Sequence, residues 1–393
     1  MNPHPKIWIV AGESSGDLYG AELACNLKRL APEAEIAGMG GVKMRQAGVR
    51  ILVDSTELGV VGVIEVLGMI FKFVRIMLFL LKKVEEERPD AVVLIDYPGF
   101  NIRLAKRLKK RGIPVIWYIS PQVWVWRKSN IPRLARYCTK MMVIFPFEVE
   151  VYKGSGLDVE FVGHPLVEVV RSRRDLALKR DPDRILLLPG SRRNETKRLL
   201  RPMLEAAVLL KRRHPALQFV ISAPREKVAQ DILDDLREFQ RKKPCPELAD
   251  TPVVSGRTPE FMQTCTAGFA ASGTVTVECA IAGLPLVVAY RLNPLTFLLA
   301  GILIRKLFRN SFTMPNIILN RKLFEEYLQF QITPHALADA MERILPAGPR
   351  RPEVEAGMEE MTQDLSCGIT GAGANAARCV LQVIGNTKPT EKK

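Results

Sequence analysis

Leu186-Leu187-Leu188-Pro189-Gly190-Ser191-Arg192 runs from a short apolar segment into a glycine turn, and a helix-like pattern follows it. Ala271-Ser272-Gly273-Thr274-Val275-Thr276-Val277-Glu278 repeats this arrangement later in the chain. A strand that passes through a glycine turn into a helix is typical of α/β folds. The turn aims backbone N–H groups and the positive end of the helix dipole at an anion. Together the two stretches predict a site for a nucleoside diphosphate.

Charged side chains next to these turns fit the same ligand. Arg192 offers a fixed fork of donors that suits phosphate. Glu278 lies about one helical turn past Gly273, where a carboxylate can hold ribose hydroxyls. Taken alone, the turn before Arg192 is also compatible with a plain helix cap. Met314-Pro315-Asn316 is compatible either with an amide near the ligand or with a simple turn.

The rest of the chain repeats short apolar runs followed by helical patterns, which predicts parallel sheets with crossover helices. The expected strands are residues 7–11, 91–95, 114–119, 141–145, 185–188, 218–222, 267–271 and 286–290. A single core stops growing near about 250 to 300 residues, and this chain has 393. We therefore predict two α/β domains, residues 1–170 and 184–345, with C-terminal helices and a tail in 346–393.

The amino-acid composition limits the classes of molecule that the protein is expected to bind. Lys and Arg number 57 against 42 Asp and Glu, a net charge of +15, which favours nucleic acid, acidic lipid or a phosphorylated substrate. No basic-aromatic RNP-like strand and no recognition-helix motif is present, which argues against nucleic acid. The seven cysteines form no CxxC pair and the four histidines are scattered. We expect reduced thiols in a cytoplasmic protein and no metal site.

Residues 58–81 are the longest apolar stretch, but Glu65, Lys72 and Arg75 interrupt it. One charge near mid-bilayer costs about 2.5 to 3.5 kcal/mol, so we do not expect the stretch to span a membrane. We also expect no signal peptide. Residues 58–81 and the basic-apolar run 292–309 are compatible with ordinary buried helices or with an interfacial surface that contacts anionic lipid.

In the first domain, Gly12-Glu13-Ser14-Ser15-Gly16-Asp17 joins the first strand to a helix expected near Leu18. Ligands bind at this edge of open α/β sheets, so the loop predicts substrate contact, with an N-capping turn as the alternative. Gly12-x-Ser14-x-Gly16 also matches the nucleophile elbow of serine hydrolases. That interpretation is disfavoured, because the elbow needs an oxyanion donor from an earlier strand and only eleven residues precede Gly12.

Two further elements follow buried runs. Asp96 ends the run 91–95, where burial would raise its pKa toward that of a useful base; a turn or cap Asp is the alternative. Tyr118-Ile119-Ser120-Pro121-Gln122-Val123-Trp124-Val125-Trp126-Arg127 holds two tryptophans at alternate positions. If the segment is extended, both indoles share one face, either as core or as a wall for a sugar or acyl group.

Six motifs occur in an order that resembles the lipid-A-disaccharide synthase family. They are residues 11–17, 95–101, 118–127, Phe161-Val162-Gly163-His164-Pro165, 188–192 and 271–274, and the resemblance covers roughly residues 7–384. It implies an inverting glycosyltransferase of the GT-B arrangement: two Rossmann-like domains with the active site in the interdomain cleft. The implied reaction joins UDP-2,3-diacylglucosamine to 2,3-diacylglucosamine 1-phosphate (lipid X), giving the β-1,6-linked lipid A disaccharide 1-phosphate and UDP, a step of lipopolysaccharide biosynthesis.

The residues support that chemistry, because a sugar nucleotide already carries a good leaving group. The enzyme then needs a base for the acceptor hydroxyl, assigned to Asp96, and support for charge developing on UDP, assigned to Arg192. Neither a metal nor a cofactor is required. The expected donor residues are Gly190, Ser191, Arg192, Ser272, Gly273, Thr274, Glu278 and Asn316. The expected acceptor residues are Glu13, Ser14, Ser15, Gly16, Asp17, Asn101, Ser120 and Gln122.

The expected partners are the two lipid substrates and the anionic inner membrane, with the protein peripheral on the cytoplasmic face. The sequence leaves undecided whether the protein forms a homo-oligomer. Three alternatives remain: another GT-B enzyme that uses a UDP-sugar, a UDP-sugar epimerase, and a peripheral membrane-binding protein without catalysis. An epimerase would share the nucleotide site but would not need a lipid-facing surface.

Overall fold

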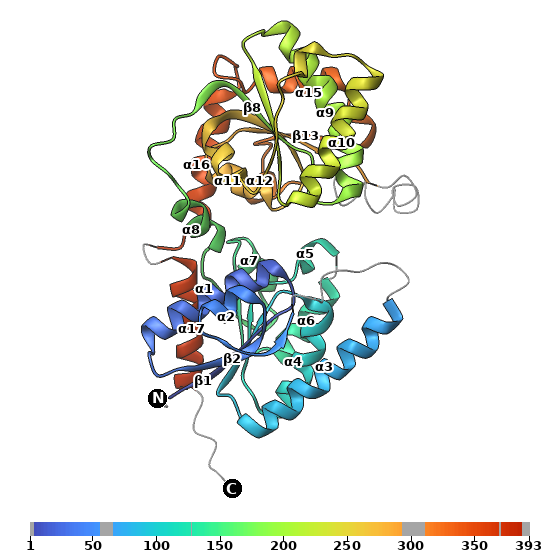
Figure 1. Cartoon of the computed structure of the whole chain (residues 1–393). Coiled ribbons are helices and arrows are strands. Elements are labelled where there is room, and N and C mark those ends of the chain that lie inside the picture. The colour runs from blue at the N-terminus through green and yellow to red at the C-terminus, as the bar shows by residue number, and fades with distance from the viewer. Residues whose placement is uncertain (1–3, 56–65, 127, 293–310, 369–370, 387–393) are drawn as a thin grey trace. The chain divides into compact units, whose positions relative to one another are not determined.

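The structure is a computed structural model that describes residues 4–55, 66–126, 128–292, 311–368 and 371–386 (Figure 1). The chain forms two compact units, called unit 1 and unit 2 below. Unit 1 comprises Met1–Pro165 and Leu365–Lys393, and unit 2 comprises Leu166–Asp364. The segment predicted as separate C-terminal helices is divided between them, since α16 (Arg351–Leu365) lies almost wholly in unit 2 and α17 (Ala372–Asn386) lies in unit 1.

Unit 1 is built on a parallel sheet of seven strands in the order β3-β2-β1-β4-β5-β6-β7. The strands are β1 (Lys6–Ala11), β2 (Glu35–Gly40), β3 (Arg50–Asp54), β4 (Ala91–Ile95), β5 (Val115–Tyr118), β6 (Lys140–Val143) and β7 (Asp158–Phe161). The four strands predicted in this unit are confirmed. Strands β2, β3 and β7 were missed, and the glycines of β2 weaken its β signal. At Gly38 (φ +150°) a Cβ would lie 1.9 Å from the Ile9 carbonyl oxygen, so only glycine lets β2 approach β1.

Helices cover both faces of this sheet (Figure 1). They are α1 (Ser14–Leu30), α2 (Val42–Gln46), α3 (Val66–Glu87), α4 (Pro98–Lys110), α5 (Val123–Trp126), α6 (Ile131–Tyr137) and α7 (Glu148–Tyr152), and α8 (Pro165–Ser172) leads into unit 2. Helix α1 packs against α17 on one face. On the other face Trp8 and Val10 of β1 join a buried cluster with Leu80 of α3 and Leu104 of α4. The α3 helix is therefore attached to the sheet along one side only.

Unit 2 has a parallel sheet of six strands in the order β10-β9-β8-β11-β12-β13. The strands are β8 (Asp181–Leu188), β9 (Gln218–Ala223), β10 (Val253–Ser255), β11 (Cys265–Ala271), β12 (Leu286–Tyr290) and β13 (Glu325–Leu328). The helices are α9 (Arg193–Arg213), α10 (Glu226–Lys242), α11 (Thr258–Thr264), α12 (Val275–Ile281), α14 (Met314–Ile318) and α15 (Pro334–Glu342), besides α16. The predicted strands are confirmed, and β8 begins at Asp181, before both the predicted strand 185–188 and the predicted start of the second domain at residue 184.

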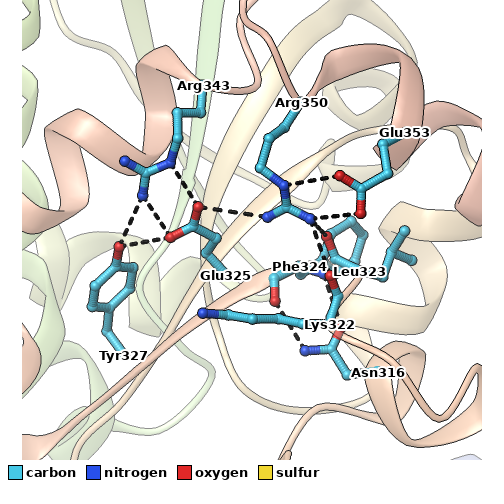
Figure 2. A network of polar contacts seen from close by, with 9 residues as sticks. All are labelled: Asn316, Lys322, Leu323, Phe324, Glu325, Tyr327, Arg343, Arg350 and Glu353. Carbon is cyan, nitrogen blue, oxygen red and sulfur yellow. Dashed lines mark hydrogen bonds and ion pairs between the residues drawn. The ribbon is translucent and has the colours of Figure 1, made fainter.

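Strand β13 at the sheet edge is anchored by a buried ion-pair network (Figure 2). The Glu325 carboxylate accepts from Arg343 Nε at 2.7 Å and Nη2 at 2.6 Å, and from the Tyr327 hydroxyl at 2.8 Å. Arg350 Nη1 approaches the same carboxylate at 3.5 Å, while its Nη2 donates to the Lys322 carbonyl at 3.0 Å. These arginines follow α15 and precede α16, so one carboxylate joins the edge strand to the chain between two helices.

We predict that Glu325→Ala lowers the free energy of unfolding by about 2 to 4 kcal/mol, because it leaves the Arg343 guanidinium without a carboxylate and removes one of the two carboxylates that Arg350 contacts. The Glu325 side chain is only 10% exposed, although Arg343 is 38% exposed and water softens the loss. The matched control is Glu360→Ala, which breaks a pair with Arg321 that is 48% exposed on both sides and should cost below about 1 kcal/mol. Urea titrations of both variants measure the difference, and equal costs would contradict the prediction.

Candidate functional site

Each sheet has a point where the chain reverses its direction of travel across the strands. In unit 1 the chain leaves β1 toward β2 but leaves β4 toward β5, and β1 and β4 are neighbours. In unit 2 the same reversal lies between β8 and β11. Ligands of open α/β sheets bind at such a switch point, beyond the carboxyl ends of the strands. The glycine and Asp96 loops singled out in the sequence follow these four strands, so both switch points are candidate sites.

The two loops of the unit 1 switch point are packed together. A Cβ at Gly12 would lie 2.3 Å from Cδ1 of the Tyr97 ring, so only glycine allows the loop after β1 to lie against the loop after β4. Glu13 is close enough to raise the pKa of Asp96. Two motifs more than eighty residues apart in the sequence therefore form one site.

Asp96 is a partly buried carboxyl group with a raised pKa. Burial is the main cause that raises its pKa to about 6, the Glu13 charge adds to the rise, and the Tyr97 N–H opposes it. A carboxyl group with this pKa is largely ionised at neutral pH and still accepts a proton readily. Among the described residues, six non-glycine residues have a positive φ, and two of them are Asp96 (φ 45°) and Tyr97 (φ 49°). Backbone strain of this kind is concentrated at functional sites.

Asn101 supports this strained turn. Its side chain is fully buried, and Nδ2 donates to the carbonyl of Asp96 at 2.8 Å and to that of Ile95 at 3.2 Å. Asn101 thus holds the backbone on which the Asp96 carboxyl group is mounted. Direct contact with an acceptor, as the sequence suggested, stays a prediction.

The first-turn residues of α1 divide into two kinds. The helix begins at Ser14, earlier than the predicted Leu18. Asp17 is buried, and its carboxylate accepts from the N–H groups of Gly41 at 2.6 Å, Lys43 at 3.0 Å and Met44 at 3.1 Å, so it caps α2. Glu13 stands at the N-cap of α1, is exposed and makes no capping bond. Ser14 and Ser15 are exposed, and Gly16 is buried. The exposed members of the loop are those that a ligand can reach.

The tryptophan segment after β5 differs from the prediction. Residues Val123–Trp126 form the short helix α5, so the argument from an extended strand with both indoles on one face is wrong. Ser120 is buried, and its hydroxyl donates to the Pro121 carbonyl at 3.0 Å and lies 2.7 Å from the Tyr152 hydroxyl. Gln122 is exposed.

Sequence reasoning missed Glu148, a buried carboxyl group that follows β6. Burial raises its pKa to about 7. The signal was present, because Glu148 follows a buried strand at a short interval, as Asp96 does. Its pairing with the Ser120 segment could not be read from the sequence.

At the unit 2 switch point, the turn after β8 presents backbone donors to an anion, which here is a side chain of the protein. Glu195 Oε2 accepts from the N–H groups of Ser191 at 3.2 Å and Arg192 at 3.3 Å. Gly190 has φ +129°, and a Cβ there would lie 2.7 Å from Glu195 Cβ. The Arg192 side chain is 80% exposed and pairs with Glu195 Oε1 at 3.2 Å. The turn thus directs its backbone N–H groups at an anion, as the sequence predicts, and here the anion is the Glu195 carboxylate.

The turn after β11 is open to solvent. Gly273 and Thr274 are exposed, and a Cβ at Gly273 would meet no atom within 4 Å. Glu278 on α12 is half-buried, which raises its pKa, and Arg173 opposes the rise. Tyr290, at the end of β12, has a pKa that burial and Glu195 raise and that Arg192 and Arg198 lower, so it lies near the charged residues that follow β8. Tyr290 was not predicted.

Asn316 is buried rather than exposed. Its Nδ2 donates to the Phe324 carbonyl at 2.9 Å and its Oδ1 accepts from the Phe324 N–H at 2.8 Å (Figure 2). Its helix α14 packs on α12, the helix that carries Glu278. Asn316 therefore connects this helix to β13, and its contact with a nucleotide stays a prediction.

The described residues contain no cluster of His, Cys, Asp and Glu suited to a metal ion, and all seven cysteines are free thiols.

Comparisons with known proteins identify the family. The sequence model described as Lipid-A-disaccharide synthetase matches residues 7–378. The chain belongs to the lipid-A-disaccharide synthase family. It is 38% identical over 395 residues to the lipid-A-disaccharide synthase of Geobacter sulfurreducens, with 98% of each chain covered. It is 36% identical over 391 residues to that of Myxococcus xanthus, covering 98% of this chain and 99% of the relative.

Solved structures confirm the GT-B class of fold for this member of the lipid-A-disaccharide synthase family. The calicheamicin glycosyltransferase CalG4 matches with a TM-score of 0.61 at 16% identity, over 99% of this chain and 100% of that chain. The UDP-GlcNAc 2-epimerase of Neisseria meningitidis bound to UDP-GlcNAc matches with a TM-score of 0.61 at 10% identity, over 97% and 100%. Fold alone thus does not separate a transferase from an epimerase. The family membership does, and the chain is a glycosyltransferase.

We predict that Asp96 titrates near pH 6 and that Glu13→Gln lowers its pKa by about 0.5 to 1, because a like charge is removed while burial is kept. Carbon-13 NMR of protein labelled at the aspartate carboxyls measures the titration, with Asp96→Asn identifying the signal. Glu33→Gln is the control, since Glu33 precedes β2 at the amino ends of the strands, whereas Asp96 follows β4 at their carboxyl ends, and the titration should stay unchanged. A midpoint near 4 in the parent protein would show that Asp96 is an ordinary solvated carboxylate.

Proposed function

We propose that the chain transfers 2,3-diacylglucosamine from its UDP derivative to the 6-hydroxyl of 2,3-diacylglucosamine 1-phosphate, forming the β-1,6-linked disaccharide 1-phosphate and UDP. Membership of the family makes it a lipid A disaccharide-forming glycosyltransferase. The observation that carries the mechanism is Asp96, a partly buried carboxyl group of raised pKa at the unit 1 switch point. Another UDP-sugar enzyme of the same fold is not favoured, because the family match spans nearly the whole chain.

The proposed chemistry needs one proton transfer and one displacement. Asp96 takes the proton of the acceptor hydroxyl as its oxygen attacks the anomeric carbon of the donor. The bond from that carbon to the UDP oxygen breaks on the opposite face, which inverts the configuration. Negative charge then develops on the diphosphate, where the Arg192 guanidinium and the N–H groups of the β8 turn can stabilise it. No step calls for a metal ion.

We assign the UDP-sugar donor to unit 2, because the turn after β8 offers groups that bind an anion. The N–H groups of Ser191 and Arg192 already hold a carboxylate, so they are oriented to bind a phosphate oxygen in its place. Arg192 is exposed enough to turn from Glu195 to the ligand. Glu278 is the candidate partner of the ribose hydroxyls, and Ser272, Gly273 and Thr274 form the open turn beside it. The acceptor is assigned to unit 1, with Glu13, Ser14, Ser15 and Gln122 as its exposed candidates.

The direct test incubates the protein with the UDP donor and the acceptor monosaccharide 1-phosphate and follows UDP release together with disaccharide formation. We predict that Asp96→Asn lowers turnover by about 10²- to 10⁴-fold while the affinity for UDP, measured by calorimetry, stays the same. Arg192→Ala should instead weaken UDP binding by about 10- to 100-fold, the cost of a charge-assisted contact. Asp96→Asn turnover above a tenth of the parent, with chemistry rate-limiting, would assign the proton to another group.

We also propose that the protein is peripheral on the cytoplasmic face of the inner membrane, because its substrates carry fatty chains. The outer side of α3 exposes Phe71 (76%), Val74 (52%), Leu78 (62%) and Phe79 (41%), a larger apolar set than a solvated helix normally shows. Exposed Lys72, Arg75 and Lys82 lie on the same helix. This pattern of apolar and basic residues suits an anionic interface.

Among the described helices, none combines the length and apolar character that crossing a membrane requires. Residues 58–65 and nearly all of 292–309 lie outside the described residues.

We predict that neutralising Lys72, Arg75, Lys82 and Lys83 together weakens binding to anionic vesicles by about 10²- to 10³-fold, since each cation near the surface contributes about 1 kcal/mol. Vesicle flotation with phosphatidylglycerol measures it, and 0.5 M salt should reproduce the loss. The matched control neutralises Lys227, Arg237, Arg241 and Lys242 of α10, which removes the same charge from unit 2. Equal losses in both variants would mean that net charge, rather than α3, drives the association.

A further inference from the structure

Glu148 is a buried carboxyl group that the proposed mechanism does not use. It is the first residue of α7 and only 1% exposed. Its Oε2 accepts from the Phe145 N–H at 3.2 Å. An ionisable group is retained in such a place at a considerable cost in desolvation, so its neighbours indicate what it does.

The neighbours of Glu148 belong to the segment after β5, which contains the acceptor candidates Ser120 and Gln122. The Ser120 hydroxyl and the Trp124 indole are close enough to oppose the effect of burial on the Glu148 pKa. Ser120 donates to the Pro121 carbonyl and therefore accepts from the Tyr152 hydroxyl, at the far end of α7, at 2.7 Å. Trp124 Nε1 is buried and reaches no hydrogen-bond acceptor among the described residues.

The ring of Trp124 is held while its N–H stays unsatisfied. Its indole meets the Phe147 ring edge to face at 5.1 Å, and Phe147 stacks on Phe145 at 5.6 Å. Ile119, which begins the segment, has φ 66°, a strained angle for a β-branched residue, and its carbonyl accepts from Trp117 Nε1 at 3.0 Å. The exposed Gln122 lies between this fixed start and Trp124, whose indole influences the pKa of Glu148.

Within the described part of the chain, the main influences on the Glu148 pKa include no cation. The influences on its pKa, besides burial, are the N–H groups of Phe145 and Ile144, the Trp124 indole and the Ser120 hydroxyl. Burial keeps the nearby titratable groups neutral: it raises the pKa of Tyr152, raises that of Cys138 to about 12 and lowers that of His164 to about 3. His164 borders the cluster through the Phe145 ring, with ring centroids 5.1 Å apart. Ionised Glu148 can therefore be stabilised only by dipoles, and the Trp124 N–H is the one still unused.

We propose that Glu148 is a positioning residue of the acceptor site, whose carboxylate, once ionised, binds the Trp124 indole N–H and so fixes the segment that carries Ser120 and Gln122. This proposal rests on the assignment of that segment to the acceptor. In the protonated form Glu148 lacks the charge that attracts the indole, and Trp124 keeps its unsatisfied N–H. The segment is then held less firmly, and the protonation state of one buried group sets how well the acceptor is placed.

The first test follows tryptophan fluorescence between pH 5.5 and 8.5 in the full chain without substrates. The parent protein should show a transition near pH 7, which Glu148→Gln and Trp124→Phe both abolish. Glu150→Gln is the matched control: it lies on the same helix, is exposed and should keep the transition. A transition that persists in Glu148→Gln overturns the proposal. If Glu148→Gln fails to fold, Trp124→Phe replaces it, and a transition that persists in Trp124→Phe overturns the proposal.

The second test separates this role from general stability. At pH 8 Glu148→Gln should raise the acceptor KM by about 5- to 20-fold, the loss of one or two hydrogen bonds, with kcat and UDP affinity nearly unchanged. At pH 6 parent and variant should have the same acceptor KM. An unchanged KM at pH 8, or equal rises at both pH values, overturns the proposal. If the parent forms no disaccharide, the proposed function fails, whereas the fluorescence transition still decides the contact between Glu148 and Trp124.

Discussion

The close approach of Tyr97 to Gly12 is the constraint on which the unit 1 site depends. It requires a residue without a Cβ after β1 and a left-handed turn after β4, and these two requirements meet at a single contact. Asn101 then fastens the turn by two hydrogen bonds to its carbonyl groups. The result is that the Asp96 carboxyl group is partly withdrawn from water beside Glu13. Its basicity is thus a property of how two loops pack.

Unit 2 uses the same kind of contact for the opposite electrostatic purpose. Gly190 lies against the Cβ of Glu195, as Gly12 lies against Tyr97, and the close approach orients backbone donors rather than a carboxyl group. Burial in unit 1 produces carboxyl groups of raised pKa, at Asp96 and Glu148. The exposed turn of unit 2 produces donors and a guanidinium group. The unit 1 switch point is therefore suited to accept a proton and the β8 turn to bind an anion, although burial also raises the pKa of one carboxyl group near the unit 2 switch point, Glu278.

Much of this was predictable, and the failures have physical reasons. Buried strands such as β4 and β8 carry strong apolar signals, so the loops that follow them were located correctly. Strands β2, β3, β7, β10 and β13 were missed; β2 is rich in glycine and β10 has only three residues, so their signals are weak. Asp17 and Asn316 were assigned to ligands, yet they bind backbone groups of the protein itself. A short polar side chain satisfies an N–H of the fold by the same chemistry that satisfies a substrate. Only the three-dimensional partner decides between these roles.

The Glu195 carboxylate on the β8 turn has a consequence for the timing of the catalytic cycle. Because the turn already holds an anion, a nucleotide bound there as proposed would enter by exchange, and the displacement of Glu195 would offset part of its binding energy. The same tethered carboxylate is at hand when the nucleotide starts to leave, and it can recapture the donors before a second nucleotide arrives. Exchange of this kind shortens the residence time of a product diphosphate. A lower equilibrium affinity for the product diphosphate thereby favours its faster release in each catalytic cycle.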